Sequence, residues 1–193
     1  MLLLSHDDPL PLERPRRFAV AGPAGAGKST LAERLCGLLG VPFTQFESFY
    51  HAPGWTVRDS WREDVLAFVA GPEWAIEWQG EEVREELTAR TQVLVWLDHP
   101  RPLTVGRTLV RTVERRFGRG TPIPGGNVEG PLWTFFTSPH HILKQAWSGH
   151  PVTRARVRRV IAEDRHPDLV VVRLRGQRQV ERWLAGPFAD AGR

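Results

Sequence analysis

The chain has 193 residues, of which 41% are hydrophobic and 25% charged, and its formal net charge is +4. This length and composition fit one folded domain with a full core, and they exclude an intrinsically disordered chain. No apolar run approaches the roughly 18 residues that a membrane-spanning helix needs, and the opening leucines are too few for a signal peptide. The single cysteine, Cys36, excludes an internal disulfide and a cysteine-based zinc site. We therefore expect a cytoplasmic protein.

The first predicted elements surround a glycine cluster. A proline-rich, polar opening is followed by a short apolar run, which predicts a buried strand. Leucines at helical spacing come next, and a glycine and a proline then predict the end of that helix. In order, we expect a flexible leader at 1–15, a strand at 17–21, a helix that ends near Gly40, and a strand at 42–46.

The middle of the chain alternates between helix and strand signals. Ser60 followed by Glu63 is the capping-box pattern, which predicts the start of a helix. The apolar run at 93–97 is continuous rather than alternating, so both of its faces should be buried, as in a parallel sheet. The elements predicted here are a helix at 60–70, a strand at 73–78, a helix at 80–90 and a strand at 93–97.

The part of the chain that follows is strongly basic. Between residues 101 and 159 it carries eleven lysines and arginines but only two acidic residues. Such an excess predicts an anionic partner, which could be nucleotide phosphates, nucleic acid or an acidic surface. The predicted elements are a basic helix at 100–116, a Gly/Pro-rich loop at 118–130, a helical stretch at 139–162 with a possible break near 149–151, a strand at 169–174 and a helix at 177–185.

The alternation of strands and helices decides the expected fold class. Strands that alternate with helices indicate βαβ units and a mostly parallel sheet. We therefore expect an α/β fold in which three layers, α/β/α, cover residues 16–193 around a five-stranded, mostly parallel sheet. Residues 100–165 are expected to form a basic helical lid on this domain.

Residues 22–29, Gly-Pro-Ala-Gly-Ala-Gly-Lys-Ser, match the phosphate-binding pattern G-x-x-x-x-G-K-[ST] in full. Its glycines let successive backbone N–H groups surround a phosphate, and the helix that follows adds partial positive charge. Lys28 can bridge the β- and γ-phosphates, and the Ser29 hydroxyl can coordinate Mg²⁺. Between a buried strand and an amphipathic helix, the pattern predicts a P-loop NTPase fold that binds MgATP or a related nucleotide. The expected nucleotide-binding residues are Gly22, Gly25, Ala26, Gly27, Lys28, Ser29 and Thr30.

The rest of the sequence narrows the class of P-loop protein. It contains no Asn-Lys-x-Asp box for guanine, and the chain is too short for an ABC or AAA ATPase. A compact P-loop domain that ends soon after its fifth strand is typical of a small-molecule or nucleotide kinase.

Several further blocks accompany the phosphate loop: Glu47-Ser48-Phe49-Tyr50-His51, Pro53-Gly54-Trp55, Trp74-Ala75-Ile76-Glu77-Trp78-Gln79, Val95-Trp96-Leu97-Asp98, Gly126-Asn127-Val128-Glu129 and Leu132-Trp133. The loop and these blocks occur in the same order as in the adenylate-kinase-related bacterial proteins called topology modulation proteins, and the chain resembles that family over nearly its whole length after residue 15. The resemblance implies the fold and the use of ATP, and it leaves the acceptor open. Many members have Asp in place of Glu47 and Asp-Gly-Asn in place of Glu77-Trp78-Gln79.

Two carboxylates follow predicted strands at the edge of the sheet where ligands bind in open α/β folds. Glu47 could accept a proton from an attacking hydroxyl or hold Mg²⁺ through water; the alternative is a solvated loop acid. Asp98 could bind the metal as a Walker-B carboxylate, or it could be the N-cap of the next helix. Both interpretations of Asp98 stay open.

Polar and aromatic side chains after the second and third predicted strands are candidates for acceptor binding. An aromatic ring there could stack on a base or sugar, while an acid and an amide could hydrogen-bond to its edge. The candidates are His51, Trp55, Glu77 and Gln79.

Arginines that recur every four residues form one stripe on the basic helix. In nucleotide kinases such a helix closes arginines over the γ-phosphate and neutralises charge in the transition state. Arg107, Arg111 and Arg115 form this stripe; a solvated basic face is the alternative. Gly176, after the fifth strand, is expected near the adenine.

Together these signals predict an ATP-dependent phosphotransferase. Lys28, Glu47, Arg107 and Arg111 are its candidate catalytic residues, and the acceptor would be a small-molecule hydroxyl or a nucleotide. The main alternative is a regulatory ATP-binding module that contacts nucleic acid through its basic half. A P-loop ATPase without an acceptor is a third possibility. No membrane partner is expected.

Overall fold

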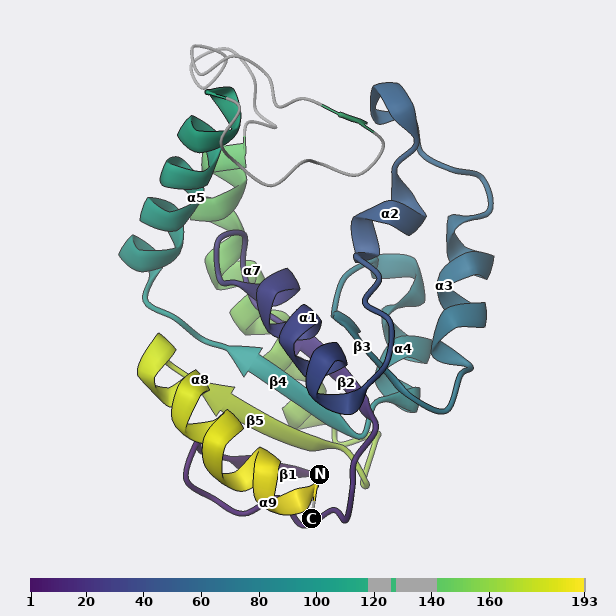
Figure 1. The fold of residues 1–193 in the computed structure, drawn as a ribbon, viewed down its shortest axis with the longest axis vertical. Helices are drawn as coiled ribbons and strands as arrows, with labels where there is room; N and C mark the ends of the chain where they lie inside the picture. The colour runs from purple at the N-terminus through teal and green to yellow at the C-terminus, as the bar shows by residue number, and fades with distance from the viewer. Residues whose placement is uncertain (118–125, 128–141, 193) are drawn as a thin grey trace.

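The computed structural model describes residues 1–117, 126–127 and 142–192, and they form one five-stranded sheet between helical layers (Figure 1). The order of strands in the sheet is β1-β5-β4-β2-β3, and every neighbouring pair is parallel. The predicted α/β fold with a five-stranded parallel sheet is therefore confirmed. The strands are β1 (Leu2–Leu4), β2 (Arg17–Ala21), β3 (Trp74–Glu77), β4 (Val93–Leu97) and β5 (Val170–Leu174).

The three inner strands are buried on both faces, as their continuous apolar runs predict. In β2, Phe18 and Val20 belong to the core on one face of the sheet, whereas Ala19 and Ala21 belong to the core on the other. This alternation follows from the two-residue period of a strand. The sheet thus needs a helical layer on each side.

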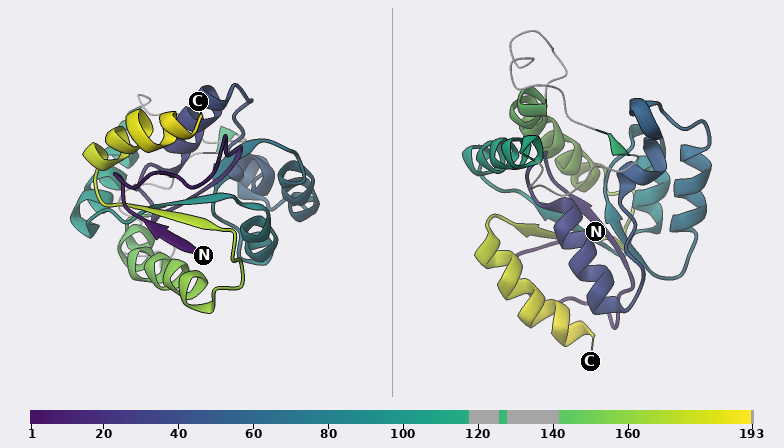
Figure 2. Two further views of the ribbon diagram at one scale, coloured as in Figure 1. Left: turned by 90° about the horizontal axis from the view of Figure 1, so that it is seen from below. Right: turned by 45° about the horizontal axis from the view of Figure 1, so that its top comes forward.

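Helices supply both layers (Figure 2). One face of the sheet is covered by α1 and α8, which bury Leu31, Leu35 and Trp183 there, and the other face by α3, α4 and α7. The bounds are α1 (Lys28–Leu39), α3 (Trp61–Val69), α4 (Arg84–Arg90), α7 (Ile142–Glu163) and α8 (Gln177–Trp183), which continues through a π-helical turn (Leu184–Phe188) into α9 (Ala189–Ala191).

The other elements lie beyond the carboxyl ends of the strands, where they can meet a ligand. The basic helix predicted at 100–116 is confirmed as α5 (Arg101–Arg116), which packs beside α7 (Figure 1). The opposite side carries α2 (Phe46–Tyr50) and a 3-10 turn (Pro53–Trp55), and a further 3-10 turn (Glu81–Val83) leads into α4. Most of the predicted Gly/Pro-rich loop, 118–125 and 128–130, and the start of the helix predicted at 139–162 fall outside the described residues.

Two predictions about strands are wrong. One expected strand is absent and one unexpected strand is present, so the sheet still has the predicted five strands. Residues 42–46 form no strand, because the place beside β2 is taken by β3 and Pro42 has no N–H to donate to a ladder. The fifth strand lies instead within the expected leader, where Leu2–Leu4 pairs in parallel with β5. Three leucines are too short a signal to predict an edge strand, and distant pairing decides their conformation.

Two helix details also differ from the sequence predictions. Ser60 is the N-cap of α3 but makes no capping bond to the backbone; its hydroxyl donates instead to Asp64, at 2.9 Å, so the expected capping box with Glu63 is absent. The α7 helix continues through Pro151 without the predicted break. Among the described helices, none combines the length and the apolar character that crossing a membrane requires.

Candidate nucleotide-binding site

The phosphate loop lies between β2 and α1, as predicted. Gly27 is the N-cap of α1 and has a φ of 89°, and Gly25 has a φ of 74°, a left-handed conformation that favours glycine. A Cβ atom on Gly25 would also overlap the Thr104 carbonyl oxygen and the Thr108 hydroxyl of α5. The loop therefore needs glycine at position 25 both for its turn and for its contact with the basic helix.

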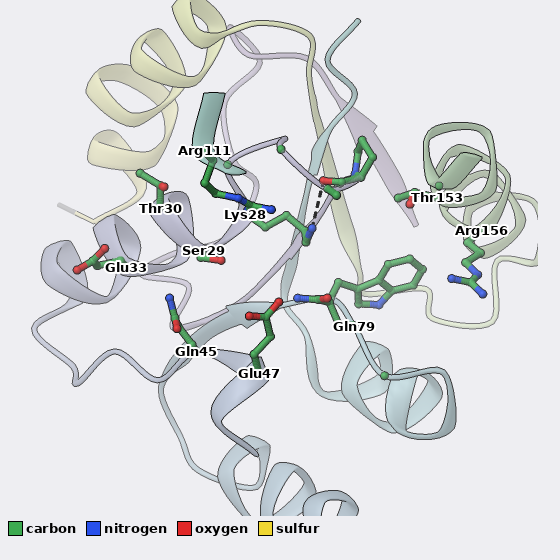
Figure 3. A pocket seen from close by; sticks show the side chains of 18 of the residues that line it. Lys28, Ser29, Thr30, Glu33, Gln45, Glu47, Gln79, Arg111, Thr153 and Arg156 are labelled. Carbon is green, nitrogen blue, oxygen red and sulfur yellow. Dashed lines mark hydrogen bonds between the residues drawn. The ribbon is translucent and has the colours of Figure 1, made fainter. Parts of the chain in front are cut away.

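The loop opens into a cavity of about 510 Å³, which we call the phosphate cavity (Figure 3). Glu47 and Gln79 lie on one side of Lys28, and Arg111 lies on the other. Acids, amides and arginines thus share one polar space with the loop. Its described lining is Gly22, Pro23, Ala24, Gly25, Gly27, Lys28, Ser29, Thr30, Glu33, Gln45, Glu47, Trp78, Gln79, Gly80, Arg84, Arg111, Arg115, Gly149, Thr153 and Arg156.

The Lys28 ammonium group lies at the centre of the loop. Its Nζ donates to the Pro23 carbonyl oxygen at 3.1 Å. Burial lowers the pKa of Lys28, the charges of Glu77 and Glu47 raise it, the charge of Arg111 lowers it, and the net direction is downward. A partly buried ammonium that, among the described residues, donates to one carbonyl oxygen has further donors for an incoming phosphate.

A second cavity, of about 300 Å³, also borders the loop; we call it the side cavity. It shares Gly25, Gly27, Thr30 and Arg111 with the phosphate cavity. Apolar side chains form much of its wall. Polar side chains from α1, α5 and α8 and from the segment after β4 complete it. The remaining lining residues are Ala26, Leu31, Arg34, Leu97, His99, Arg107, Gln177 and Val180.

The arginine stripe of α5 lies along both cavities. Arg107 lines the side cavity and donates to the Gln177 side chain at 3.3 Å, Arg111 lines both cavities, and Arg115 lines the phosphate cavity. The spacing of four residues therefore places three guanidinium groups in a row beside the phosphate loop.

The two acids near α2 differ in their surroundings. Glu47 lies in the first turn of α2 and lines the phosphate cavity. Glu77, at the end of β3, is only 1% exposed, is absent from the described lining, and accepts the Phe46 N–H at 2.9 Å. Glu77 therefore fixes the start of α2, and the acceptor-binding role predicted for it stays a prediction that this geometry does not favour.

Asp98 binds arginines. Its carboxylate accepts hydrogen bonds from Arg154, at 3.0 Å to each oxygen, and from Arg173, whose Nε lies at 2.8 Å. The N-cap interpretation is wrong, because Pro100 is the N-cap of α5. Asp98 also does not line the phosphate cavity, and two guanidinium groups surround its oxygens, so it does not fit a metal ligand.

Mg²⁺ needs few protein ligands when it binds together with a nucleotide. It usually takes one or two protein oxygens and fills its octahedron with phosphates and water. Among the described residues no group of three or more His, Cys, Asp or Glu side chains could hold a metal ion. The Ser29 hydroxyl and the Glu47 carboxylate both line the phosphate cavity, and this donor set fits a metal that arrives with a triphosphate.

The predicted acceptor residues separate into two places. Gln79 lines the phosphate cavity, whereas His51 and Trp55 lie in the loop after α2 with their rings 5.1 Å apart. Asn127 holds that loop: its side chain accepts from the Trp55 N–H at 2.9 Å and donates to the Ala52 carbonyl at 3.2 Å. Acceptor binding by His51 and Trp55 stays a prediction, as does the adenine contact of Gly176, which is the N-cap of α8 beside Gln177.

The structure adds lining residues that the sequence did not indicate. Gln45 precedes α2, Arg84 begins α4, and Thr153 and Arg156 lie one turn apart on α7. Only Arg156 had a signal, since it lies in the basic part of the chain between residues 101 and 159, for which an anionic partner was predicted. Arg84 lies in a segment of mixed charge that gives no periodic signal.

Comparisons with known proteins identify no family. No protein-family model matches the chain, and no curated protein matches it. Among solved structures, the chain is similar to a gluconokinase from Sinorhizobium meliloti 1021, with a TM-score of 0.48 and 18% sequence identity over 93% of this chain and 95% of that one. A similarity at this level carries no inference about activity or substrate.

Proposed function

We propose that the protein is an ATP-dependent phosphotransferase that transfers the γ-phosphate of MgATP to a small-molecule hydroxyl or a nucleotide. One observation carries the proposal: the phosphate loop, with Lys28 inside it, opens into a cavity that also contains Glu47 and Arg111. The resemblance of the sequence to the topology modulation proteins supports the same class. We place this activity in the cytoplasm.

The two cavities suit the two ends of ATP. The triphosphate would bind along the loop in the phosphate cavity, where backbone N–H groups and Lys28 receive it. The nucleoside would lie in the side cavity, whose apolar wall and polar Gln177 and His99 suit a base. Arg111 lines both cavities, so its guanidinium could contact the phosphates where they pass from one cavity into the other.

The proposed reaction is an in-line displacement at the γ-phosphorus. The acceptor oxygen forms a bond to phosphorus, and the bond between phosphorus and the β–γ bridging oxygen breaks, so ADP leaves. Where the acceptor is a hydroxyl, Glu47 takes its proton. Lys28, Arg111 and Arg115 neutralise charge on the transferred group, and Mg²⁺, held by Ser29, supplies further charge neutralisation when bound.

No observation specifically supports the nucleic-acid alternative, because many arginines of the basic half line the two cavities or form an ion pair within the protein. Arg154 is paired with Asp98. Those that line the two cavities are Arg107, Arg111, Arg115 and Arg156.

The proposal is tested by nucleotide binding and by product analysis. MgATP should raise the melting temperature, and saturation at 100 times Kd corresponds to about 2.7 kcal/mol of stabilisation. ADP release should depend on an acceptor, and mass spectrometry should show the acceptor with one added phosphoryl group. The variant Lys28→Ala should lose both effects. Unchanged MgATP affinity in this variant would refute the proposal, and ATP hydrolysis without any phosphorylated acceptor would indicate an ATPase.

A further inference from the structure

Two arginines outside the α5 stripe line the phosphate cavity on the side of β3 and α4. Arg84 is the first residue of α4, and Arg156 comes from α7. Trp78 and Gln79 line the same cavity. Figure 3 shows Arg156 on the far side of this cavity from Arg111. A region of the cavity away from the phosphate loop therefore carries its own positive charge.

The Arg84 guanidinium has a hydrogen-bond donor that no described residue uses. It lies over the Trp78 ring, with 5.2 Å from its central carbon to the ring centroid, so the stack fixes its plane. Its Nε atom is buried and has no hydrogen-bond partner among the described residues. A buried donor without a partner destabilises the protein, and a bound acceptor atom would remove this cost.

Among the described residues, Arg156 makes an ion pair that a ligand can replace. Its guanidinium donates to Glu81 at 2.9 Å; the Arg156 side chain is 40% exposed and the Glu81 side chain 75%. Exposed ion pairs of this kind contribute little to stability, because water screens the charges. An anion inside the cavity would compete with Glu81 at little cost.

The electrostatics point the same way. Burial lowers the pKa of Arg84, the charge of Arg156 lowers it further, and Glu81 opposes them without reversing the direction. Two like charges are thus held together in a partly buried place with too little negative charge nearby. A bound anion would relieve both the burial and the repulsion.

We infer that Arg84 and Arg156 form the binding site for an oxyanion carried by the phosphoryl acceptor, either a phosphate monoester or a carboxylate. Forked guanidinium groups suit both, since each presents two oxygens to paired N–H donors. The inference rests on the proposed function and gives it an acceptor class: an anionic substrate, with its anion anchored by these arginines and its reacting oxygen beside Glu47.

The test measures anion binding separately from nucleotide binding. The protein is first saturated with a non-hydrolysable MgATP analogue, so that the phosphate loop is filled. Inorganic phosphate and, in a parallel arm, acetate are then titrated by calorimetry. The double variant Arg84→Gln/Arg156→Gln should bind the preferred anion at least about tenfold more weakly than the unaltered protein, because paired charges are lost. The matched control Arg158→Gln changes an exposed arginine of α7 that lines neither cavity, and it should bind normally.

The outcomes separate the two proposals. Unchanged analogue affinity in the double variant shows that it is folded. If the analogue fails to bind the unaltered protein, the proposed function is wrong, and the anion titrations are then made in Lys28→Ala. Equal anion affinity in the unaltered protein and the double variant, or no anion binding in either, would overturn the inference. Phosphate binding alone assigns a phosphate monoester, and acetate binding alone a carboxylate.

Discussion

The carboxylate of Glu77, at the end of β3, accepts the backbone N–H of Phe46 across 2.9 Å, and this bond joins the buried sheet to the start of α2. The next residue along the chain is Glu47, which lines the phosphate cavity. The position of the proposed general base thus depends on an acid that is itself almost fully buried.

Substitutions at Glu77 should therefore affect the fold and the placement of Glu47. We expect Glu77→Leu to lower the free energy of unfolding by about 1–3 kcal/mol, because the buried Phe46 N–H loses its acceptor. The variant Glu77→Gln keeps an oxygen that can accept the bond and should retain most of the stability. Chemical denaturation measures both. Equal losses in the two variants would show that the charge, rather than the hydrogen bond, is what matters.

Lys28 should stabilise the nucleotide complex and destabilise the free protein. Because burial is the main reason that the pKa of Lys28 is lowered, the variant Lys28→Met should be more stable than the unaltered protein without nucleotide and should lose MgATP binding. The unfolded chain holds the Lys28 proton more tightly than the folded chain, so the stability of the unaltered protein should rise with pH between the lowered and the ordinary lysine pKa. Denaturation at several pH values tests this: Lys28→Met should lack that rise, and a less stable Lys28→Met would contradict the prediction.

Arg111 should act mainly on the chemical step. Its position beside both cavities suits charge neutralisation on the transferred group, so Arg111→Gln should lower kcat by about 10²–10³-fold. Steady-state kinetics with MgATP and the unphosphorylated acceptor give kcat, and calorimetry gives the Kd for the MgATP analogue, which should change far less. Arg158→Gln again serves as the control. A loss confined to nucleotide affinity would assign Arg111 to ground-state binding.

Asp98 should stabilise the folded protein, and the size of this stabilisation should depend on pH. Burial by itself raises the pKa of Asp98, but the hydrogen bonds and charges of Arg154 and Arg173 outweigh it, and the pKa lies below its ordinary value. The pairing therefore stabilises the protein above the ordinary aspartate pKa, and that stabilisation is lost as the pH falls towards the lowered value. We expect Asp98→Asn to cost about 1–3 kcal/mol at pH 7, because the partly exposed guanidinium groups of Arg154 and Arg173 lose the charge of a buried carboxylate partner.

The pH dependence supplies the check on Asp98. In denaturation experiments the difference between the unaltered protein and Asp98→Asn should be constant near neutrality and shrink in acid. A difference that is independent of pH would mean that the carboxylate charge is irrelevant. The same variant should keep Mg²⁺-dependent MgATP binding, since Asp98 does not line the phosphate cavity.

The sequence predicted the features that depend on neighbours along the chain. The phosphate loop, the inner strands and the basic helix each carry a local pattern, so they could be placed to within a few residues. The arginine stripe could be predicted as well, because Arg107, Arg111 and Arg115 share one face by spacing alone.

The features that were missed depend on contacts between distant segments. Leu2–Leu4 forms a strand through its pairing with β5. The carboxylate of Asp98 is paired with Arg154 of α7 and Arg173 of β5, so it does not fit the metal-binding role that its position after a strand predicted. Arg84 becomes a candidate for anion binding only when its positions beside the Trp78 ring and near Arg156 are known. No pattern within one segment records such pairings.

The missing side chain of Gly25 has a mechanical consequence. Since only a hydrogen atom separates this turn of the loop from Thr104 and Thr108, a ligand that changed the shape of the loop would also press on α5. Arg107 and Arg111 travel on that helix. In the proposed function, binding of a polyphosphate to the loop would therefore also change the position of these arginines, and a methyl group at position 25 would force the loop and α5 apart.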